Sequence, residues 1–402
     1  MSSPGLRVRS TVPLYVAAGA SFAALAARGL TVPLYAHELG ASRFEVGALF
    51  SVSTLAAALL SLPAGMLVDR LGARTLLAGS LVLAAASQIA IAATPNIPPL
   101  FAWQVIGGLA AGAQQAALFS AVTESVRDGQ LGRAMGWLTF SMQAGFFLGP
   151  SIAGVALRWI DVRTDIAFTT VLLLLTIPGV MAASGTRQSS AGVALVGPLK
   201  ALLRQSAFLP VSIGLVAATL GWGTVGAFLP VFGREALGLT NAEVGYLLAL
   251  QAVVNGLSRP AGGRLVDRAR HRWPIVFVGV LVWSAASVLL GHLTGFLWPA
   301  VVLAVATPFM AVAFVAMGVV FADLSGASTR GVAMGVYGTI LFLGLTAGPL
   351  AFGPIVQGSG YAAGFTVCAA IAAALALVMA ALHAEPLRPR EEVRLPPPAP
   401  GT

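Results

Sequence analysis

Long apolar segments follow one another along almost the whole chain, and short segments that carry the charged residues separate them. Each apolar segment reaches or approaches the roughly 20 residues that a helix needs to cross the hydrocarbon layer of a membrane. They lack the alternation of apolar and polar positions that is typical of membrane-barrel strands. We therefore expect twelve membrane-spanning helices, over residues 11–36, 44–67, 75–94, 98–124, 134–157, 166–184, 207–232, 242–264, 274–292, 297–322, 332–356 and 361–383.

The composition excludes the main water-soluble classes of protein. Of the residues, 57% are hydrophobic and 9% are charged, and the mean hydropathy is +0.89. A soluble globular protein carries about a quarter charged residues, and a disordered chain has far fewer apolar ones. We expect an all-α protein embedded in the lipid bilayer.

The positive charges predict how the chain crosses the membrane. Most of the 23 lysine and arginine residues fall between spans on one side if the N-terminus is cytoplasmic, whereas Arg28 and Arg259 lie within spans. Because loops rich in basic residues stay in the cytoplasm, we expect both termini there and the protein in the cytoplasmic (inner) membrane. The net charge of +9 then reflects topology and does not indicate a nucleic-acid partner.

The first and second halves of the chain repeat each other at an offset of about 198 residues. Glu45-Val46-Gly47 recurs as Glu243-Val244-Gly245, and the segment 67–70 recurs as 265–268. Two parallel bundles imply a cavity between them that rocking exposes to either side of the membrane, which is how a transporter works. The predicted parts are an N-terminal segment 1–10, a six-helix bundle 11–184, a linker 185–206, a second six-helix bundle 207–383 and a tail 384–402.

The segment between the second and third spans contains Gly65, Asp69, Arg70, Gly72 and Arg74. Its pattern resembles the G-x3-D-R-x-G-x-R loop of the major facilitator superfamily. The resemblance implies two pseudo-symmetric bundles of six helices each. The repeat of this loop keeps Asp267, Arg268 and Arg272 but has an arginine where the second glycine belongs.

The same resemblance implies a gate on the cytoplasmic side, in which these loops latch the halves when the cavity faces outward. The acidic partners would be Glu124 for Arg70 or Arg74, and Asp323 for Arg268 or Arg272; the sequence leaves both pairings open. The alternative is that these charges only set topology in water, where a pair contributes under about 1 kcal/mol.

A run of small residues in the fifth span, Gly145, Gly149, Pro150 and Gly154, allows helices to pack closely. It resembles a family motif associated with antiporters, with Ala153 in place of one glycine, and this favours export. The pattern recurs as Gly344, Gly348 and Pro349, so a purely architectural role stays open.

Polar and aromatic residues inside the spans are candidates for substrate contact. Arg28 has no carboxylate at its depth, so it either binds a substrate group, which we favour, or braces the backbone. Gln251, Asn255 and Arg259 follow at helical spacing and form either a cavity wall or a seam between helices. Gln104 occupies a place where the family often has an arginine tied to proton movement. The remaining substrate-binding candidates are Gln114, Gln115, Gln143, Trp222 and Tyr337.

The sequence contains no nucleotide-binding loop, no set of catalytic residues and no metal-ligand spacing, so we predict neither an enzyme nor a cofactor. The leading hypothesis is a monomeric secondary transporter that exports a small organic compound by alternating access and proton antiport. One alternative is an importer or uniporter of an organic anion bound by Arg28. The other is a membrane sensor that uses the same scaffold without transport.

Overall fold

The computed structural model describes residues 11–61, 63–125, 131–183, 196–324 and 330–382, and helices make up nearly all of this part of the chain. The first half contains α1 (Val12–Glu38), α2 (Arg43–Ser61), α3 (Ala64–Leu71), α4 (Ala73–Ala93), α5 (Ile97–Ser125), α6 (Leu131–Ala156) and α7 (Val162–Ala182). The second half contains α8 (Val196–Leu203), α9 (Phe208–Glu235), α10 (Asn241–Arg268), α11 (Trp273–Leu290), α12 (Leu297–Asp323) and α13 (Arg330–Ala381).

These helices give twelve membrane crossings. In the described part of the chain, ten helices are long and apolar enough to span a membrane, and α13 counts among them once. It is two helices joined at Gly360, whose φ of 85° and ψ of 173° break the helical path. The twelfth crossing is α10, which has sufficient length but carries Arg259, Arg264 and Arg268.

Proline and glycine shift one predicted boundary. The uninterrupted span expected over 44–67 is wrong, because α2 ends at Ser61 and α3 begins at Ala64, directly after Pro63. Pro63 has helical backbone angles, with a φ of −72° and a ψ of −14°, and is the N-cap residue of α3. Gly72, with a φ of 84° that favours glycine, then separates α3 from α4.

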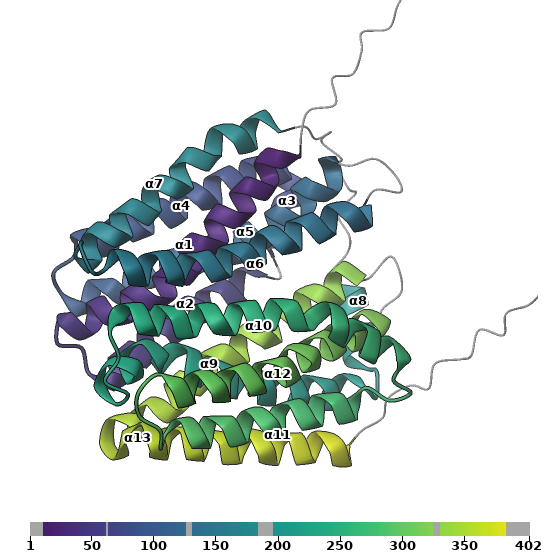
Figure 1. Cartoon of the computed structure of the whole chain (residues 1–402). Helices are drawn as coiled ribbons and strands as arrows, with labels where there is room; N and C mark the ends of the chain where they lie inside the picture. Colours follow the sequence, from purple (N-terminus) through teal and green to yellow (C-terminus); the bar gives the residue numbers. More distant parts are fainter. Residues whose placement is uncertain (1–10, 62, 126–130, 184–195, 325–329, 383–402) are drawn as a thin grey trace, which may run out of the picture.

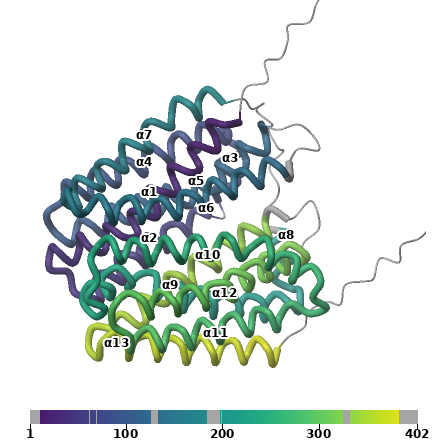
Figure 2. The backbone as a smooth tube through the Cα atoms, in the orientation of Figure 1, coloured from purple at the N-terminus to yellow at the C-terminus, as the bar shows by residue number. Residues whose placement is uncertain are grey.

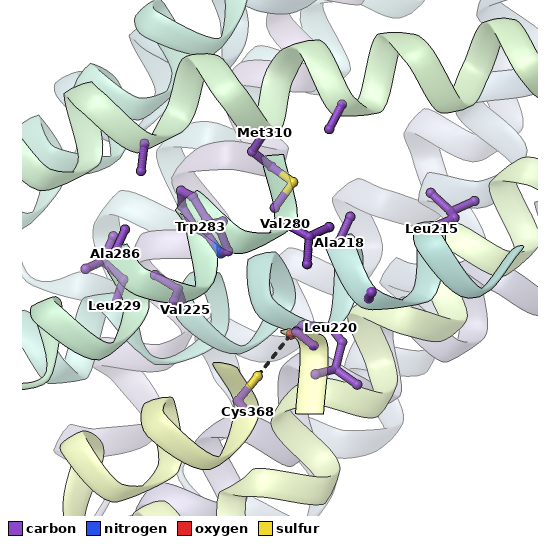
Figure 3. Packing of buried hydrophobic residues seen from close by; sticks show 14 of the residues in the cluster. Leu215, Ala218, Leu220, Val225, Leu229, Val280, Trp283, Ala286, Met310 and Cys368 are labelled. Atoms are coloured by element: carbon purple, nitrogen blue, oxygen red, sulfur yellow. Dashed lines mark hydrogen bonds between the residues drawn. The ribbon is translucent and has the colours of Figure 1, made fainter. Parts of the chain in front are cut away.

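The two halves lie side by side, with α1–α7 in one group and α9–α13 in the other (Figures 1 and 2). Each group has its own buried apolar cluster. In the second group, Trp283 of α11 and Met310 of α12 meet residues of α9, and Cys368 of α13 points to Leu220 of α9 (Figure 3). Its thiol donates to the Leu220 carbonyl at 3.8 Å.

The repeated glycine motif lies in equivalent helix contacts. A side chain on Gly145 or Gly149 of α6 would collide with the backbone of α1 at Gly19, Ala23 and Ala27. In the second half, Gly344 and Gly348 of α13 lie against α9 in the same way, at Thr219, Leu220 and Thr224. In both halves, the missing side chains let the fifth helix of the repeat approach the first.

Candidate functional site

Two helix pairs make most of the contact between the halves, α2 with α13 and α6 with α10, and α1 and α2 also touch α9. Gly47 of α2 faces the carbonyl of Pro349 in α13, and Gly245 of α10 faces the carbonyl of Pro150 in α6. Since Gly47 and Gly245 are repeat partners, as are Pro150 and Pro349, the two contacts are copies of one another. The sequence repeat thus marks where the halves touch, near the predicted outer face.

Hydrogen bonds reinforce the contact between α2 and α13. Ser51 Oγ donates to the Thr346 carbonyl at 2.9 Å, and the hydroxyls of Thr54 and Thr346 lie 2.8 Å apart. Ser51 is buried, with 1% of its surface exposed. These bonds give partners to polar groups that would otherwise be buried between the halves without a hydrogen bond.

A cluster of charged and polar side chains lies at the predicted outer face, and we call His37, Arg43, Glu235, Gln357 and Tyr361 the outer latch. Arg43 Nε lies 2.7 Å from Glu235 Oε2, and His37 Nδ1 lies 3.4 Å from Glu235 Oε1. The Tyr361 hydroxyl donates to Glu235 Oε2 at 3.0 Å, and the Arg43 backbone N–H donates to Gln357 Oε1 at 2.8 Å. His37 and Arg43 belong to the first half and the other three to the second, so the latch spans the interface.

Two other acids at this face have a structural role. The Glu45 carboxylate accepts from the backbone N–H and hydroxyl of Ser42, each at 2.8 Å, just before α2. Glu243 does the same for Thr240 at the start of α10, and the Thr240 hydroxyl accepts from the Glu243 N–H. Both acids therefore cap helices by satisfying donors of the first turn.

At the predicted cytoplasmic face, the structure identifies one partner of Asp323. Arg272, directly before α11, places Nη1 at 2.6 Å from Asp323 Oδ2 at the end of α12. The Arg272 side chain is 6% exposed and the Asp323 side chain 42%. Asp267 and Arg268 are exposed. The pair joins α11 to α12 within the second half and does not itself cross to the first.

The first copy of the loop is arranged around the start of α4. Gly65 and Arg70 are exposed on α3, Arg74 is half-buried in the first turn of α4, and Glu124 is half-buried near the end of α5. The side chain of Asp69 lies outside the described residues.

Four of the predicted substrate-binding residues come together where α6 meets α10. A methyl group added to Gly256 of α10 would lie 3.0 Å from Nε2 of Gln143 in α6. One turn further along α10, Arg259 Nε donates to Asn255 Oδ1 at 3.0 Å. Tyr337 of α13 lies within electrostatic range of Arg259. We call Gln143, Asn255, Arg259 and Tyr337 the interface group.

Arg28 does not belong to this group. It is 8% exposed and donates from Nη2 to Oε1 of Gln104 in α5, with its guanidinium packed over Gly107. It lies on roughly the opposite side of α1 from Leu30, which joins the core cluster of the second half. This position favours the bracing role over substrate contact, with a glutamine side chain as the partner instead of backbone carbonyls.

Among the other candidates, Gln251 lies one turn before Asn255 on α10, Gln114 and Gln115 lie on α5, and Trp222 lies on α9. Trp222 is half-buried and packs on Trp283 and Phe314, with ring centroids 4.7 Å and 5.9 Å away. Gln251 and Gln114 are buried at 8% and 9% exposure. Gln115 is exposed on α5.

Sequence reasoning missed two acids. Glu235 ends α9, and no pattern along the chain connects it with Arg43. Asp165 precedes the predicted span 166–184, yet it is 2% exposed and its Oδ2 has no hydrogen-bond partner. The helical spacing that it shares with Leu173 and Thr176, both buried, is a signal that reveals its inward face.

Comparison with known proteins agrees with this architecture. Residues 14–308 and 211–401 match the Major Facilitator Superfamily. The quinolone resistance protein NorA of Staphylococcus aureus is 28% identical over 123 residues, 31% of this chain and 32% of the relative. Multidrug resistance protein 2 of Bacillus subtilis is 26% identical over 195 residues, 48% of this chain and 47% of the relative. The chain thus matches a third to a half of the length of these curated relatives.

Two solved structures share the fold. The nucleoside transporter NupG superposes with a TM-score of 0.75 at 14% identity, covering 94% of this chain and 99% of NupG. A bacterial homologue of the human lysosomal transporter Spinster, described as inward-facing and occupied, superposes with a TM-score of 0.70 at 14% identity. The match covers 92% of this chain and 94% of the homologue. The matched residues, the repeated halves and the twelve crossings lead to one conclusion: this chain belongs to the major facilitator superfamily.

Proposed function

We propose that the protein is a secondary transporter that exports a small organic compound across the cytoplasmic membrane by alternating access. The observation that carries this proposal is the contact between the halves at the predicted outer face. There the glycine–proline contacts and the outer latch hold α2 against α13 and α6 against α10. Toward the end that carries the predicted cytoplasmic loops, the ribbons of the halves diverge (Figure 1). We interpret this arrangement as an inward-facing state.

The names of the relatives support export. Two matched proteins are named for resistance to quinolones or to multiple drugs, and removing a compound from the cell confers resistance to it. The glycine motif of α6 is neutral on direction, because its copy in α13 makes the same packing contacts. Import of an anion through Arg28 has less support, since Arg28 is bonded to Gln104 inside the first half.

We propose protons as the coupling ion and Glu235 as the acid through which they act on the outer latch. The groups that face its carboxylate are His37 of α1, Arg43 of α2 and Tyr361 of α13. A proton on Glu235 removes the negative charge that holds Arg43 and His37. A neutral Glu235 side chain should therefore loosen the latch and favour an outward-facing state.

On the cytoplasmic side, we propose that the Arg272–Asp323 pair positions the second loop for the gate of the outward-facing state. The pair ties the start of α11 to the end of α12, so Asp267 and Arg268 are presented from a fixed turn. Glu124, Arg70 and Arg74 form the corresponding gate region of the first half. We also propose that both termini are cytoplasmic and that the protein acts as a monomer.

Inverted membrane vesicles test transport and direction together. Vesicles are acidified inside by respiration, the pH gradient is followed with a quenched acridine dye, and a panel of drugs, nucleosides and organic acids is added. A compound that recovers fluorescence only in vesicles with the protein is exchanged for protons. If no compound in the panel does so, and none accumulates when energised, the export proposal fails.

A further inference from the structure

We infer that the transported compound carries a carboxylate, and that Arg259 in the interface group binds it. The inference rests on the proposed transport function and names the chemical class of its substrate. It starts from the direction in which Arg259 points. Gly256 faces α6 of the first half, and Gly262 faces Val312 of α12 in the second. Arg259 lies between these two directions around α10, so it points between the helices and not into lipid.

The opposite side of α10 confirms this orientation. Leu257 is 75% exposed and lies roughly 160° around the helix from Arg259. Leu265 is 56% exposed and also lies away from the α6 contact. These leucines mark the lipid-facing side. Arg259 is nevertheless exposed, so solvent reaches it from the side of the interface, as it must reach a substrate site.

Within the described part of the chain, no acidic side chain forms an ion pair with Arg259. Its nearest acids along α10 are Glu243 and Asp267, about four and two helical turns away. Among the described residues, neither forms an ion pair with it, and Tyr337 is the ionisable group that acts on it. An arginine within the membrane calls for an anionic or strongly polar partner. Since the described residues near Arg259 supply only neutral partners, we infer that the substrate supplies the anionic group.

The geometry of the guanidinium narrows the class of anion. Asn255 accepts from Nε at 3.0 Å and is itself 7% exposed, so the amide fixes the plane of the guanidinium. This leaves the edge formed by Nη1 and Nη2, which presents two parallel N–H groups. A carboxylate accepts from both at once, in the bidentate arrangement that arginine favours. Gln143 of the other half lies against Gly256, one turn before Arg259 on α10, so the first half borders this part of the helix.

Three ligands of nearly the same shape test whether the Arg259 site prefers a negatively charged ligand. Benzoate, benzamide and benzamidine share a ring and a planar group but carry negative, neutral and positive charge. Thermal unfolding of the purified full-length protein is measured with each. A ligand that binds the folded state raises the melting temperature. We expect benzoate to raise it clearly more than benzamide, and benzamidine to raise it least. Equal shifts for benzoate and benzamide, or a larger shift for benzamidine, would overturn the inference.

Substitutions on α10 test whether the preference for benzoate depends on Arg259. Arg259→Gln should weaken benzoate binding about tenfold or more, because it removes a charge-assisted pair of hydrogen bonds. Arg259→Lys should keep part of the preference, since the charge remains but the fork is lost. Arg264→Gln, an exposed arginine on the same helix, should behave as the wild type. Unchanged benzoate affinity in Arg259→Gln would contradict the assignment, and the ligand comparison in the wild type decides if that variant does not fold.

Failure of the carboxylate inference can be distinguished from failure of the transport proposal. If vesicles exchange compounds for protons but without preference for carboxylates, transport stands and this inference falls. If benzoate binds through Arg259 but no compound is moved, the carboxylate site stands and the export proposal falls.

Discussion

Glu235 is the residue on which most of the charged contacts between the halves converge. Its two carboxylate oxygens receive Arg43, His37 and Tyr361, from three different helices. Its side chain is 21% exposed, so an external proton can reach it while the bonds are formed in a partly desolvated setting. Arg43 also lies 4.8 Å from the centre of the Tyr361 ring, which adds a cation–π contact across the interface.

The first prediction is that Glu235→Gln loosens the outer face. The neutral amide keeps the size of the side chain but loses the charge that holds Arg43, so the outward-facing state should gain population. A cysteine introduced at Ser51, which is 1% exposed between α2 and α13, should then react faster with a membrane-impermeant maleimide, in a background in which Cys368 is replaced by alanine.

The control for this variant is Glu243→Gln at the same face. Its amide can still accept from the Thr240 backbone N–H, so the helix cap persists and labelling should not change. Equal labelling rates in Glu235→Gln and the parent protein would show that the latch does not hold the outer face.

The second prediction concerns Arg272 and Asp323. Either Arg272→Gln or Asp323→Asn should lower the free energy of unfolding by about 1–3 kcal/mol, because the arginine is buried and its ion pair partly so. Arg268→Gln, which alters the other candidate arginine at an exposed position, should change it by less than about 0.5 kcal/mol. Denaturant unfolding in detergent gives these values. Additive effects in the double variant would mean that the pair is not coupled.

At the scale of whole helices, the repeated glycines and prolines set how closely the halves approach. Gly47 and Gly245 occupy the same place in the two copies of the repeat, and each receives a proline carbonyl from the other half. A proline removes one N–H from its helix, and here its own carbonyl lies at the interface. Closure of the outer face therefore depends on the absence of two side chains as much as on charge.

The third prediction is that Gly245→Ala favours the outward-facing state and slows transport. The added methyl group would collide with the Pro150 carbonyl and lie 3.1 Å from Gly154 Cα, so α6 and α10 must separate. Gly263→Ala on the same helix meets no atom within 4 Å and serves as the matched control. Labelling of a cysteine at Ser51 measures the shift, and wild-type flux and labelling in Gly245→Ala would contradict it.

At the scale of the whole molecule, twelve crossings place the two ends of the chain on one side of the membrane. The fourth prediction follows from the basic loops that accompany those ends. With Cys368 replaced by alanine, a cysteine at Ala236 should react with an impermeant maleimide in intact cells. A cysteine at Arg270 should react only after the membrane is opened. The reverse pattern would invert the topology and, with it, the direction in which the structure is open.

The residues alone predict the membrane class, the number of crossings, the duplication and the family, because spans and repeats are local patterns that the lipid bilayer and gene duplication impose on a sequence. The sequence also indicated Gln143, Asn255, Arg259 and Tyr337, since polar residues are conspicuous inside apolar spans. It did not reveal that Pro63 interrupts the second span, because hydropathy continues through the break.

The partners of the charged residues, by contrast, depend on the folded structure. Arg43 lies 192 residues from Glu235 along the chain, and Arg28 lies 76 residues from Gln104. Asp165 lies just before the predicted span 166–184, and the packing of α7 buries it. Partners of this kind are chosen by how helices pack, and that packing depends on the shapes of many side chains at once. For the same reason, Arg28 and Arg259, which look alike in the sequence, have different surroundings: one is held inside a bundle, and the other faces the interface.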